Sequence, residues 1–182
     1  PYEPGAVMMP ITLALALDNG LVEPETVVST YNGKMEFQNG RFITDSEKYN
    51  ALSTSEMIRH SSNIGIAQVS WLLSAYGFRK GLEKFGFANR SGIEFYRDKE
   101  GFIQSASKLE NKMYSSGTAY GYGMLATFTQ LLKAYNVFNN KGSSITPHLV
   151  DFIQGSNSKS SDISSQNEKR QTVSTKTASQ IH

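Results

Sequence analysis

Residues 4–18, PGAVMMPITLALALD, decide the fold of this chain, because they are apolar on every side and carry no charge before Asp18. Alanine, leucine and methionine lose little side-chain freedom in a helix, and a proline such as Pro10 is tolerated in the first turns. A helix that is apolar all round must be buried all round. The run of about 14 residues is also shorter than the ~20 residues that cross a bilayer. We therefore expect a core helix that ends at Asn19 and Gly20, where glycine readily takes the left-handed conformation.

The overall composition indicates one globular domain or a large piece of one. Of the 182 residues, 38% are hydrophobic and 19% are charged, which is enough apolar surface for a core. The net charge of +2 and the lack of a block of like charges give no support to nucleic acid or an anionic membrane as a partner. Cysteine is absent, so disulfides and thiolate metal sites are excluded. The three histidines are far apart and lack acidic neighbours at metal-ligand spacing, so we expect neither a metal nor a cofactor.

A hairpin and a short helix are predicted next in the chain. Residues 34–37 and 41–44 flank an Asn-Gly pair at 39–40, which is the strongest short-range signal of a tight turn between two strands. Ser53 can cap a helix that begins after it, and Glu56 can accept a hydrogen bond from the Ser53 backbone N–H, which makes a capping box.

A Ser-Ser-Asn triplet, Ser61, Ser62 and Asn63, stands at the start of the following helix, which we predict over residues 64–77. Apolar residues recur there at helical spacing, and Gly77 can end the helix. Hydroxyl and amide side chains at a helix N-terminus either cap the helix or face a cleft. The residues alone leave both interpretations open.

A glycine and tyrosine loop, GTAYGYG at residues 117–123, is too unusual for a simple linker. It is either a turn with aromatic lids or the wall of a binding groove, and the spacing does not decide between these. A second capping box, Thr127 with Gln130, opens a helix that we expect to end at residues 139–142.

The last part of the chain mixes a strand pattern, a polar loop and a helix start. Residues 146–153 resemble a strand, and residues 155–170 are rich in serine, asparagine and charge, so we expect a flexible serine-rich loop or the tip of a long hairpin. Residues 172–181 are typical of the beginning of a helix, with Ser174 as its cap.

Taken in order, these stretches resemble the transpeptidase domain of class B penicillin-binding proteins, most closely the septal, cell-division type. The resemblance covers nearly the whole chain and implies a mainly α chain with small β elements, namely the helical subdomain of the α/β penicillin-binding transpeptidase fold, which is serine β-lactamase-like. The stretches that carry it are YEPG at 2–5 with its apolar helix, the hairpin, RHSSNIG at 59–65, FGF at 85–87, YGYG at 120–123 with the helix after it, and TPHLV at 146–150.

This family brings three motifs together in one cleft. Ser-x-x-Lys supplies the nucleophilic hydroxyl and its amine base, Ser-x-Asn supplies a relay hydroxyl and a substrate-holding amide, and Lys-Thr-Gly binds the carboxylate end of the substrate. The second motif is intact here. The resemblance therefore implies Ser61 and Asn63 as retained catalytic residues and Ser62, Tyr120, Gly121 and Tyr122 as substrate-binding residues.

The first motif keeps its spacing but loses both functional groups. When the sequence is aligned on EPG at 3–5, Ala6 occupies the nucleophile position and Met9 occupies the lysine position. A methyl group cannot attack a carbonyl, and a thioether cannot take up a proton, so covalent catalysis is lost while binding can survive. The loss of both partners leaves no orphan charge, as expected of an engineered chain or a natural pseudoenzyme.

The third motif is only superficially matched by Lys-Thr-Ala-Ser at residues 176–179. In the family, a helix that begins with a Thr-Ala pair precedes the true Lys-Thr-Gly strand, and residues 174–181 match that helix better. The chain also begins abruptly at Pro1, ends at His182 without a stop, and carries no signal peptide or membrane segment. We therefore expect residues 1–182 to be a partial transpeptidase domain from which the true Lys-Thr-Gly strand is absent.

Two functions follow from these expectations. The first is part of a peptidoglycan D,D-transpeptidase of cell-wall synthesis, catalytically silent as given, whose parent binds peptidoglycan stem peptide or β-lactam. The alternative is a non-catalytic pseudoenzyme or scaffold that presents Tyr114, Tyr120, Tyr122 and Phe128 to cell-division or cell-wall partners.

The resemblance also implies a location and a mode of association. Its parent family is membrane-anchored and works in the periplasm, at the outer face of the cytoplasmic membrane, whereas the fragment itself is expected to be soluble. A missing sheet would leave an apolar face exposed, so self-association is expected as well.

Overall fold

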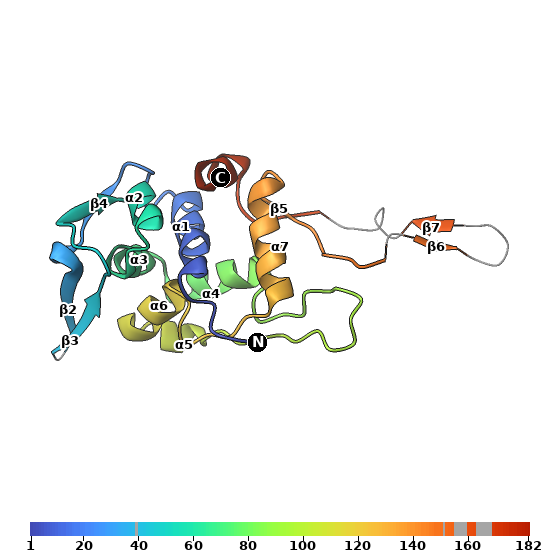
Figure 1. Ribbon diagram of the computed structural model, residues 1–182, viewed down its shortest axis with the longest axis horizontal. Helices are drawn as coiled ribbons and strands as arrows, with labels where there is room; N and C mark the ends of the chain where they lie inside the picture. The colour runs from blue at the N-terminus through green and yellow to red at the C-terminus, as the bar shows by residue number, and fades with distance from the viewer. Residues whose placement is uncertain (39, 151, 155–159, 163–168) are drawn as a thin grey trace.

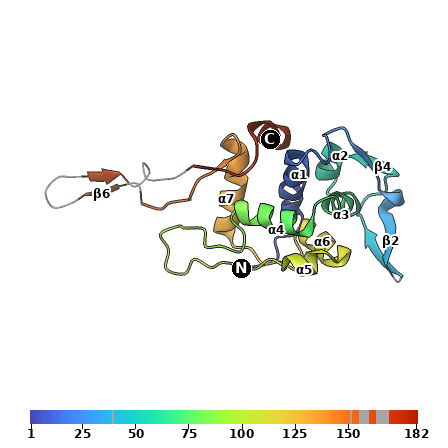
Figure 2. The ribbon, with the colours of Figure 1, turned by 180° about the vertical axis from the view of Figure 1, so that it is seen from behind.

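Helix α1 (Met9–Asp18) lies at the centre of the computed structural model, which describes residues 1–38, 40–150, 152–154, 160–162 and 169–182. A 3-10 turn, η1 (Gly5–Met8), leads into it, and seven of its ten residues are buried. Both views place α1 between α3 (Asn63–Ser70) and α7 (Phe128–Asn139) (Figures 1 and 2). The predicted all-round burial is confirmed.

Some of the other helices pack directly against α1, and the rest pack against those helices. Several of them begin where the sequence places caps. The capping boxes of Ser53 with Glu56 and of Thr127 with Gln130 both form, and Ser174 caps the last helix. These further helices are α2 (Thr54–Arg59), α4 (Ala75–Lys84), α5 (Ala106–Leu109), α6 (Lys112–Ala119) and α8 (Thr175–Ile181).

The predicted helix over residues 64–77 is wrong, because it is two helices. Helix α3 ends at Ser70, and Ser74 starts α4 by accepting a hydrogen bond from the Gly77 N–H at 3.0 Å. A serine that caps a new helix outweighs the continuing apolar spacing, so Gly77 lies in the first turn of α4 and does not end α3.

The strands of the described residues form four separate antiparallel pairs, and isolated antiparallel bridges join Tyr2 to Ala126 and Phe102 to Leu125. The hairpin predicted near residues 34–44 is confirmed, with a bulge between Glu36 and Gln38. The pairs are β1 (Val27–Ser29) with β4 (Ala51–Ser53), β2 (Lys34–Gln38) with β3 (Arg41–Thr44), β5 (Ser143–Ser144) with β8 (Arg170–Gln171), and β6 (Phe152–Gln154) with β7 (Ser160–Asp162). A short turn, η2 (Tyr31–Gly33), precedes β2.

The strand predicted over residues 146–153 is only partly right. Residues 146–150 belong to no strand, and β6 begins at Phe152. Pro147 has no N–H to donate to a ladder, so this stretch cannot take a central place in a sheet. The loop predicted at residues 155–170 lies mostly outside the described residues, and β6 and β7 stand apart from the helices (Figure 1).

The Lys-Thr-Ala stretch at residues 176–178 is helical, because it belongs to α8. Lys176, Thr177 and Ala178 lie inside this helix, with Ala178 in the hydrophobic core. Its start is tied to the end of α1, because Asp18 Oδ1 accepts from the Ser174 N–H at 2.7 Å and from Thr177 Oγ1 at 2.9 Å. The stretch is therefore a helix start, as predicted, and not a strand.

The longest helix in the described part of the chain is α7, with 12 residues. None of the described helices has the length and hydropathy of a membrane span.

Candidate functional site

Ala6 and Met9 lie at the start of the buried helix. Ala6 is exposed on η1, and Met9, at the first position of α1, is 2% exposed. Tyr135 on α7 holds this segment, because its hydroxyl donates a hydrogen bond to the Val7 carbonyl at 2.7 Å. Ala6 therefore faces solvent, and Met9 faces the core.

The loop predicted over residues 117–123 is wrong for residues 117–119, which form the end of α6, and the glycine and tyrosine loop is therefore residues 120–123, which contact this segment directly. The Gly5 N–H donates to the Gly121 carbonyl at 3.0 Å, and the Gly123 N–H donates to Glu3 Oε1 at 2.8 Å. Gly121 has φ of +83°, and a Cβ there would collide with the Gly5 backbone. Only glycine allows the loop to approach the Gly5 backbone this closely.

The two tyrosines of the loop face different surroundings. Tyr120 is half-buried and packs against both hydrophobic clusters, and burial raises the pKa of its phenol. Tyr122 is 54% exposed, and its ring centre lies 5.9 Å from that of Tyr120. The loop thus has one anchoring ring and one ring that solvent can reach.

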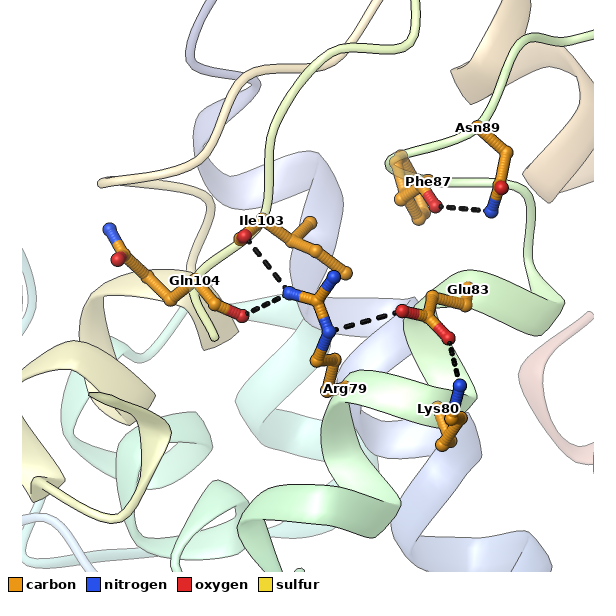
Figure 3. Close-up of polar contacts among 7 residues, drawn as sticks. All are labelled: Arg79, Lys80, Glu83, Phe87, Asn89, Ile103 and Gln104. Carbon is orange, nitrogen blue, oxygen red and sulfur yellow. Dashed lines mark hydrogen bonds and ion pairs between the residues drawn. The ribbon is translucent and has the colours of Figure 1, made fainter. Parts of the chain in front are cut away.

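Arg79 is the centre of a polar network (Figure 3), and Gln104 connects this network to the far end of the loop. Arg79 Nη1 on α4 donates to the carbonyls of Ile103 and Gln104 at 3.1 and 2.6 Å, while Arg79 Nε lies 3.1 Å from Glu83 Oε1. The Gln104 side chain then donates from Nε2 to the Gly123 carbonyl at 2.7 Å. Helix α4 therefore supports the loop indirectly, because Arg79 binds the Gln104 backbone and the Gln104 side chain binds Gly123.

The Ser-Ser-Asn turn connects α2 to α3. Ser61 is exposed and has φ of +50°, a conformation that few residues other than glycine adopt. Ser62 is 1% exposed and caps α3 by accepting from the Gly65 N–H at 2.9 Å. The half-buried Asn63 donates from Nδ2 to the Thr44 carbonyl at 3.1 Å. The helix-capping interpretation thus applies to Ser62, whereas Ser61 is left open to solvent.

Asp45, which follows strand β3, clamps this turn. Its Oδ2 accepts from Ser62 Oγ at 2.6 Å, and its Oδ1 accepts from the Ile64 N–H at 3.0 Å. A carboxylate at a helix N-terminus satisfies free N–H groups and interacts favourably with the helix dipole. Asp45 therefore fixes the position of both residues that flank Asn63.

Glu47 holds the preceding residue, His60. Glu47 Oε2 accepts from the Tyr49 hydroxyl at 2.8 Å and lies 2.9 Å from His60 Nδ1. The hydrogen bond from Tyr49, and after it that from His60, lowers the pKa of Glu47, while Glu47 raises the pKa of Tyr49. The end of β3 and the segment after it thus hold the turn at residues 60, 62, 63 and 64.

The core brings the two parts of the site together through helix packing. Helix α3 packs against both α1 and α6, and Tyr120 lies against the cluster that contains Ile64. In the described residues, no hydrogen bond joins Ser61 or Asn63 to Ala6 or Met9. Of the other aromatic candidates, Phe128 is 69% exposed, whereas Tyr114 is only 37% exposed.

Comparison with known proteins gives one consistent answer. A family model described as penicillin binding protein transpeptidase domain matches residues 1–182. The peptidoglycan D,D-transpeptidase FtsI of Escherichia coli K12 is 24% identical over 144 residues, which make up 78% of this chain and 23% of that protein. The chain spans about a quarter of the length of the curated relatives it matches.

Solved structures agree with the family model. The apo transpeptidase domain of Burkholderia pseudomallei penicillin-binding protein 3 superposes with a TM-score of 0.86 at 25% identity, over 99% of this chain and 51% of that one. Penicillin-binding protein 3 of Mycobacterium tuberculosis, solved with aztreonam, gives 0.89 at 20% identity, over 100% of this chain and 40% of that one, and supports the fold alone.

The Asp45 clamp predicts a loss of stability when the carboxylate is removed. Asp45→Ala should lower the free energy of unfolding by about 1–3 kcal/mol, because a helix cap is lost and the buried Ser62 hydroxyl loses its acceptor. Asp45→Asn should cost less, since its amide oxygen still accepts from Ile64. Urea unfolding measures both, with the exposed neighbour Ser46→Ala as the control. Equal stability of Asp45→Ala and the control would contradict the clamp.

The Glu47 cluster predicts a pH-dependent contribution. Because the folded pKa of Glu47 lies below its ordinary value of 4.5, ionised Glu47 stabilises the fold above that pH, and this stabilisation is lost as the pH falls through the lowered pKa. Glu47→Gln should therefore have a lower melting temperature than the wild type at pH 7, and this difference should shrink as the pH falls below 4.5. Tyr49→Phe should give a smaller gap with the same pH dependence. A gap that stays constant with pH would contradict this assignment.

Proposed function

The chain belongs to the penicillin-binding protein transpeptidase family, and from that premise we propose that it forms the helical, Ser-x-Asn-bearing part of a peptidoglycan D,D-transpeptidase that is catalytically silent in this form. The predicted fold, a helical part of the penicillin-binding transpeptidase fold, is confirmed. Curated relatives of the chain carry the name peptidoglycan D,D-transpeptidase. The activity, substrates and partners of the whole protein are our proposal for this chain.

One observation carries the proposal, namely the contact between the loop at Gly121 and the segment of Ala6. The hydrogen bond from Gly5 to Gly121, together with the lack of room for a Cβ, fixes the loop next to the nucleophile position. Helix α3, which presents Ser61 and Asn63, packs against the helix that follows Ala6. Such a convergence of loop, turn and nucleophile position suits a cleft for acyl transfer.

The side chains limit what this cleft can do. Acyl transfer needs a nucleophile and a base that removes its proton, and Ala6 and Met9 supply neither a hydroxyl nor an amine. We propose that Ser61 provides a hydroxyl and Asn63 an amide for a peptide-like ligand, with Tyr122 beside them. Ser62, whose hydroxyl is used inside the chain, would then act by holding the turn. The remaining capacity is non-covalent binding.

The ligand class follows from this chemistry. We propose that the parent protein binds a peptidoglycan stem peptide, and a β-lactam as its mimic, at the outer face of the cytoplasmic membrane. Binding of a β-lactam is recorded for the Mycobacterium tuberculosis structure, whose ligand is aztreonam. No metal or cofactor enters this proposal.

The alternative function is a scaffold domain without catalysis. The exposed rings of Tyr122 and Phe128 could anchor cell-division or cell-wall proteins, since aromatic residues dominate binding hot spots. Self-association of the chain would use the same kind of exposed surface. The ordered cleft elements favour the transpeptidase assignment over this alternative.

The missing nucleophile predicts that the chain forms no covalent adduct with a penicillin. Intact-mass spectrometry after incubation with a fluorescent penicillin should show the mass of the chain alone, because the Ala6 methyl cannot attack the β-lactam carbonyl. A stoichiometric mass increase on the chain as given would contradict the proposal.

The double variant Ala6→Ser, Met9→Lys tests the cleft itself. An adduct on this variant alone, with circular dichroism unchanged, is the result we expect if the cleft is formed in advance. A folded double variant without an adduct would count against a functional cleft in this part of the domain. The single variant Ala6→Ser serves as the control, because it has a hydroxyl without an amine base.

A further inference from the structure

A groove of about 430 Å³ lies between strand β2 and helix α3, which are neighbours in both views of the molecule (Figures 1 and 2). Its volume falls within the ~300–1,000 Å³ of small-molecule sites. The lining includes three aromatic and three polar side chains, namely Tyr31, Phe37, Trp71, Glu36, Gln68 and Lys112. Flat apolar surface combined with a few polar groups is typical of a site that binds a small ligand.

Contacts within the chain hold the aromatic wall of the groove in place. The Phe37 and Trp71 rings stack with their centres 5.5 Å apart, and Lys112 Nζ lies 4.5 Å from the centre of the Trp71 ring. Trp71 Nε1 donates to Ser116 Oγ at 2.9 Å. Tyr31, by contrast, is 53% exposed, so its ring is open to a ligand.

The polar groups of the groove have unused hydrogen-bonding capacity. Gln68 Nε2 donates to two backbone carbonyls at 2.8 and 3.1 Å, so this amide is fixed and its Oε1 is left as an acceptor. In the part of the chain that the structure describes, the Glu36 carboxylate and the Tyr31 hydroxyl make no hydrogen bond or ion pair, and Lys112 has no carboxylate partner.

The charges of the groove disfavour several classes of ligand. Glu36 and Lys112 carry opposite charges, so a phosphate would meet a carboxylate and a quaternary ammonium ion would meet an ammonium group. A purely apolar ligand would bury both charges without partners. A neutral ligand with many hydrogen-bond donors and acceptors suits the groove best.

An extended peptide that adds to β2 as a further strand is also disfavoured. Strand addition uses free N–H and C=O groups along a sheet edge. The Lys34 N–H donates to the Tyr31 carbonyl, in the turn that precedes the strand, and is therefore already used. A ligand in the groove has to be held by side chains.

We propose that the groove binds a sugar chain, with an N-acetylated amino sugar over the Tyr31 ring. A sugar ring can pack its apolar C–H face on an aromatic ring, and each of its hydroxyls both donates and accepts. The acetamido carbonyl accepts from the Lys112 ammonium, and the acetamido N–H donates to Glu36 or to Gln68 Oε1. The two unpaired charges of the groove thus match the two polar ends of one amide.

Helix α3 connects this groove with the candidate site. The helix begins at Asn63 and carries Gln68 in the groove, and a rise of 1.5 Å per residue places Gln68 about 8 Å further along the helix axis. A stem peptide at Ser61 and Asn63 would therefore have its sugar chain within reach of the groove. Assignment of the sugar to the glycan of peptidoglycan rests on the proposed function, whereas the sugar site itself does not.

Tryptophan fluorescence of the 182-residue chain tests the proposal, because Trp71 is the single tryptophan and lines the groove. Titration with the tetrasaccharide of N-acetylglucosamine should change its emission in a saturable way, with a Kd of about 1 mM, as expected of a shallow site with few hydrogen bonds. Maltotetraose, which lacks acetamido groups, should bind about tenfold more weakly.

Variants of the lining residues locate the bound sugar. Tyr31→Ala should raise the Kd by about tenfold because the stacking ring is lost, and Tyr31→Phe by only about twofold because the hydroxyl alone is lost. Glu36→Ala should raise it by about tenfold through loss of the charged acceptor. The matched controls Tyr96→Ala and Glu25→Ala, at exposed residues outside the groove, should leave the Kd unchanged. Circular dichroism checks that each variant folds.

The proposal is overturned by an emission that does not respond up to about 20 mM tetrasaccharide. It is also overturned if folded Tyr31→Ala and Glu36→Ala bind as tightly as the wild type, or if maltotetraose binds equally well. A response to a D-alanyl-D-alanine peptide and not to the sugar would assign the groove to a peptide instead. The titration needs no functional group at positions 6 and 9, on which the penicillin experiment depends, so the sugar site and the proposed function can fail separately.

Discussion

Every side of helix α1 has to be covered, because seven of its ten residues are withdrawn from water and its sequence offers no polar face. Helices α2, α3, α4 and α8 all pack against it. The approach is close, since a Cβ at Gly81 of α4 would collide with the Leu15 side chain. The arrangement of the chain is thus set by the demand of one helix for apolar neighbours on all sides.

The geometry of the candidate site depends on the burial of α1. Thr12, on the buried helix, donates from its hydroxyl to the Ala119 carbonyl at 3.0 Å and so holds the end of α6, directly before Tyr120. In the part of the chain that the structure describes, the hydrogen bonds that hold the loop and the Ser-Ser-Asn turn do not involve the side chain of Ala6 or Met9. A buried thioether at Met9 also suits the core, whereas a lysine there would need a partner for its charge. These hydrogen bonds therefore do not depend on the hydroxyl and the amine that we propose are replaced at positions 6 and 9.

Local sequence patterns predicted the helices and the hairpin, but they did not predict the contacts between residues that are far apart in the sequence. The buried helix, the capping boxes at Ser53 and Thr127 and the helix start at Ser174 are encoded within a few residues, and all were predicted. The helix over residues 64–77 failed because the cap at Ser74 competes with apolar spacing. Asp45 and Glu47 were missed, since they act on a turn 13–19 residues away, and nothing local in the sequence marks them.

Native-state hydrogen exchange of residues 11–16 tests the central claim most directly. If the fold depends on burial of α1, these amides exchange only through global unfolding, with an opening free energy equal to that from urea unfolding and the same denaturant dependence. Exchange of residues 11–16 through local openings that do not respond to denaturant, while α3 or α7 stays protected, would contradict it.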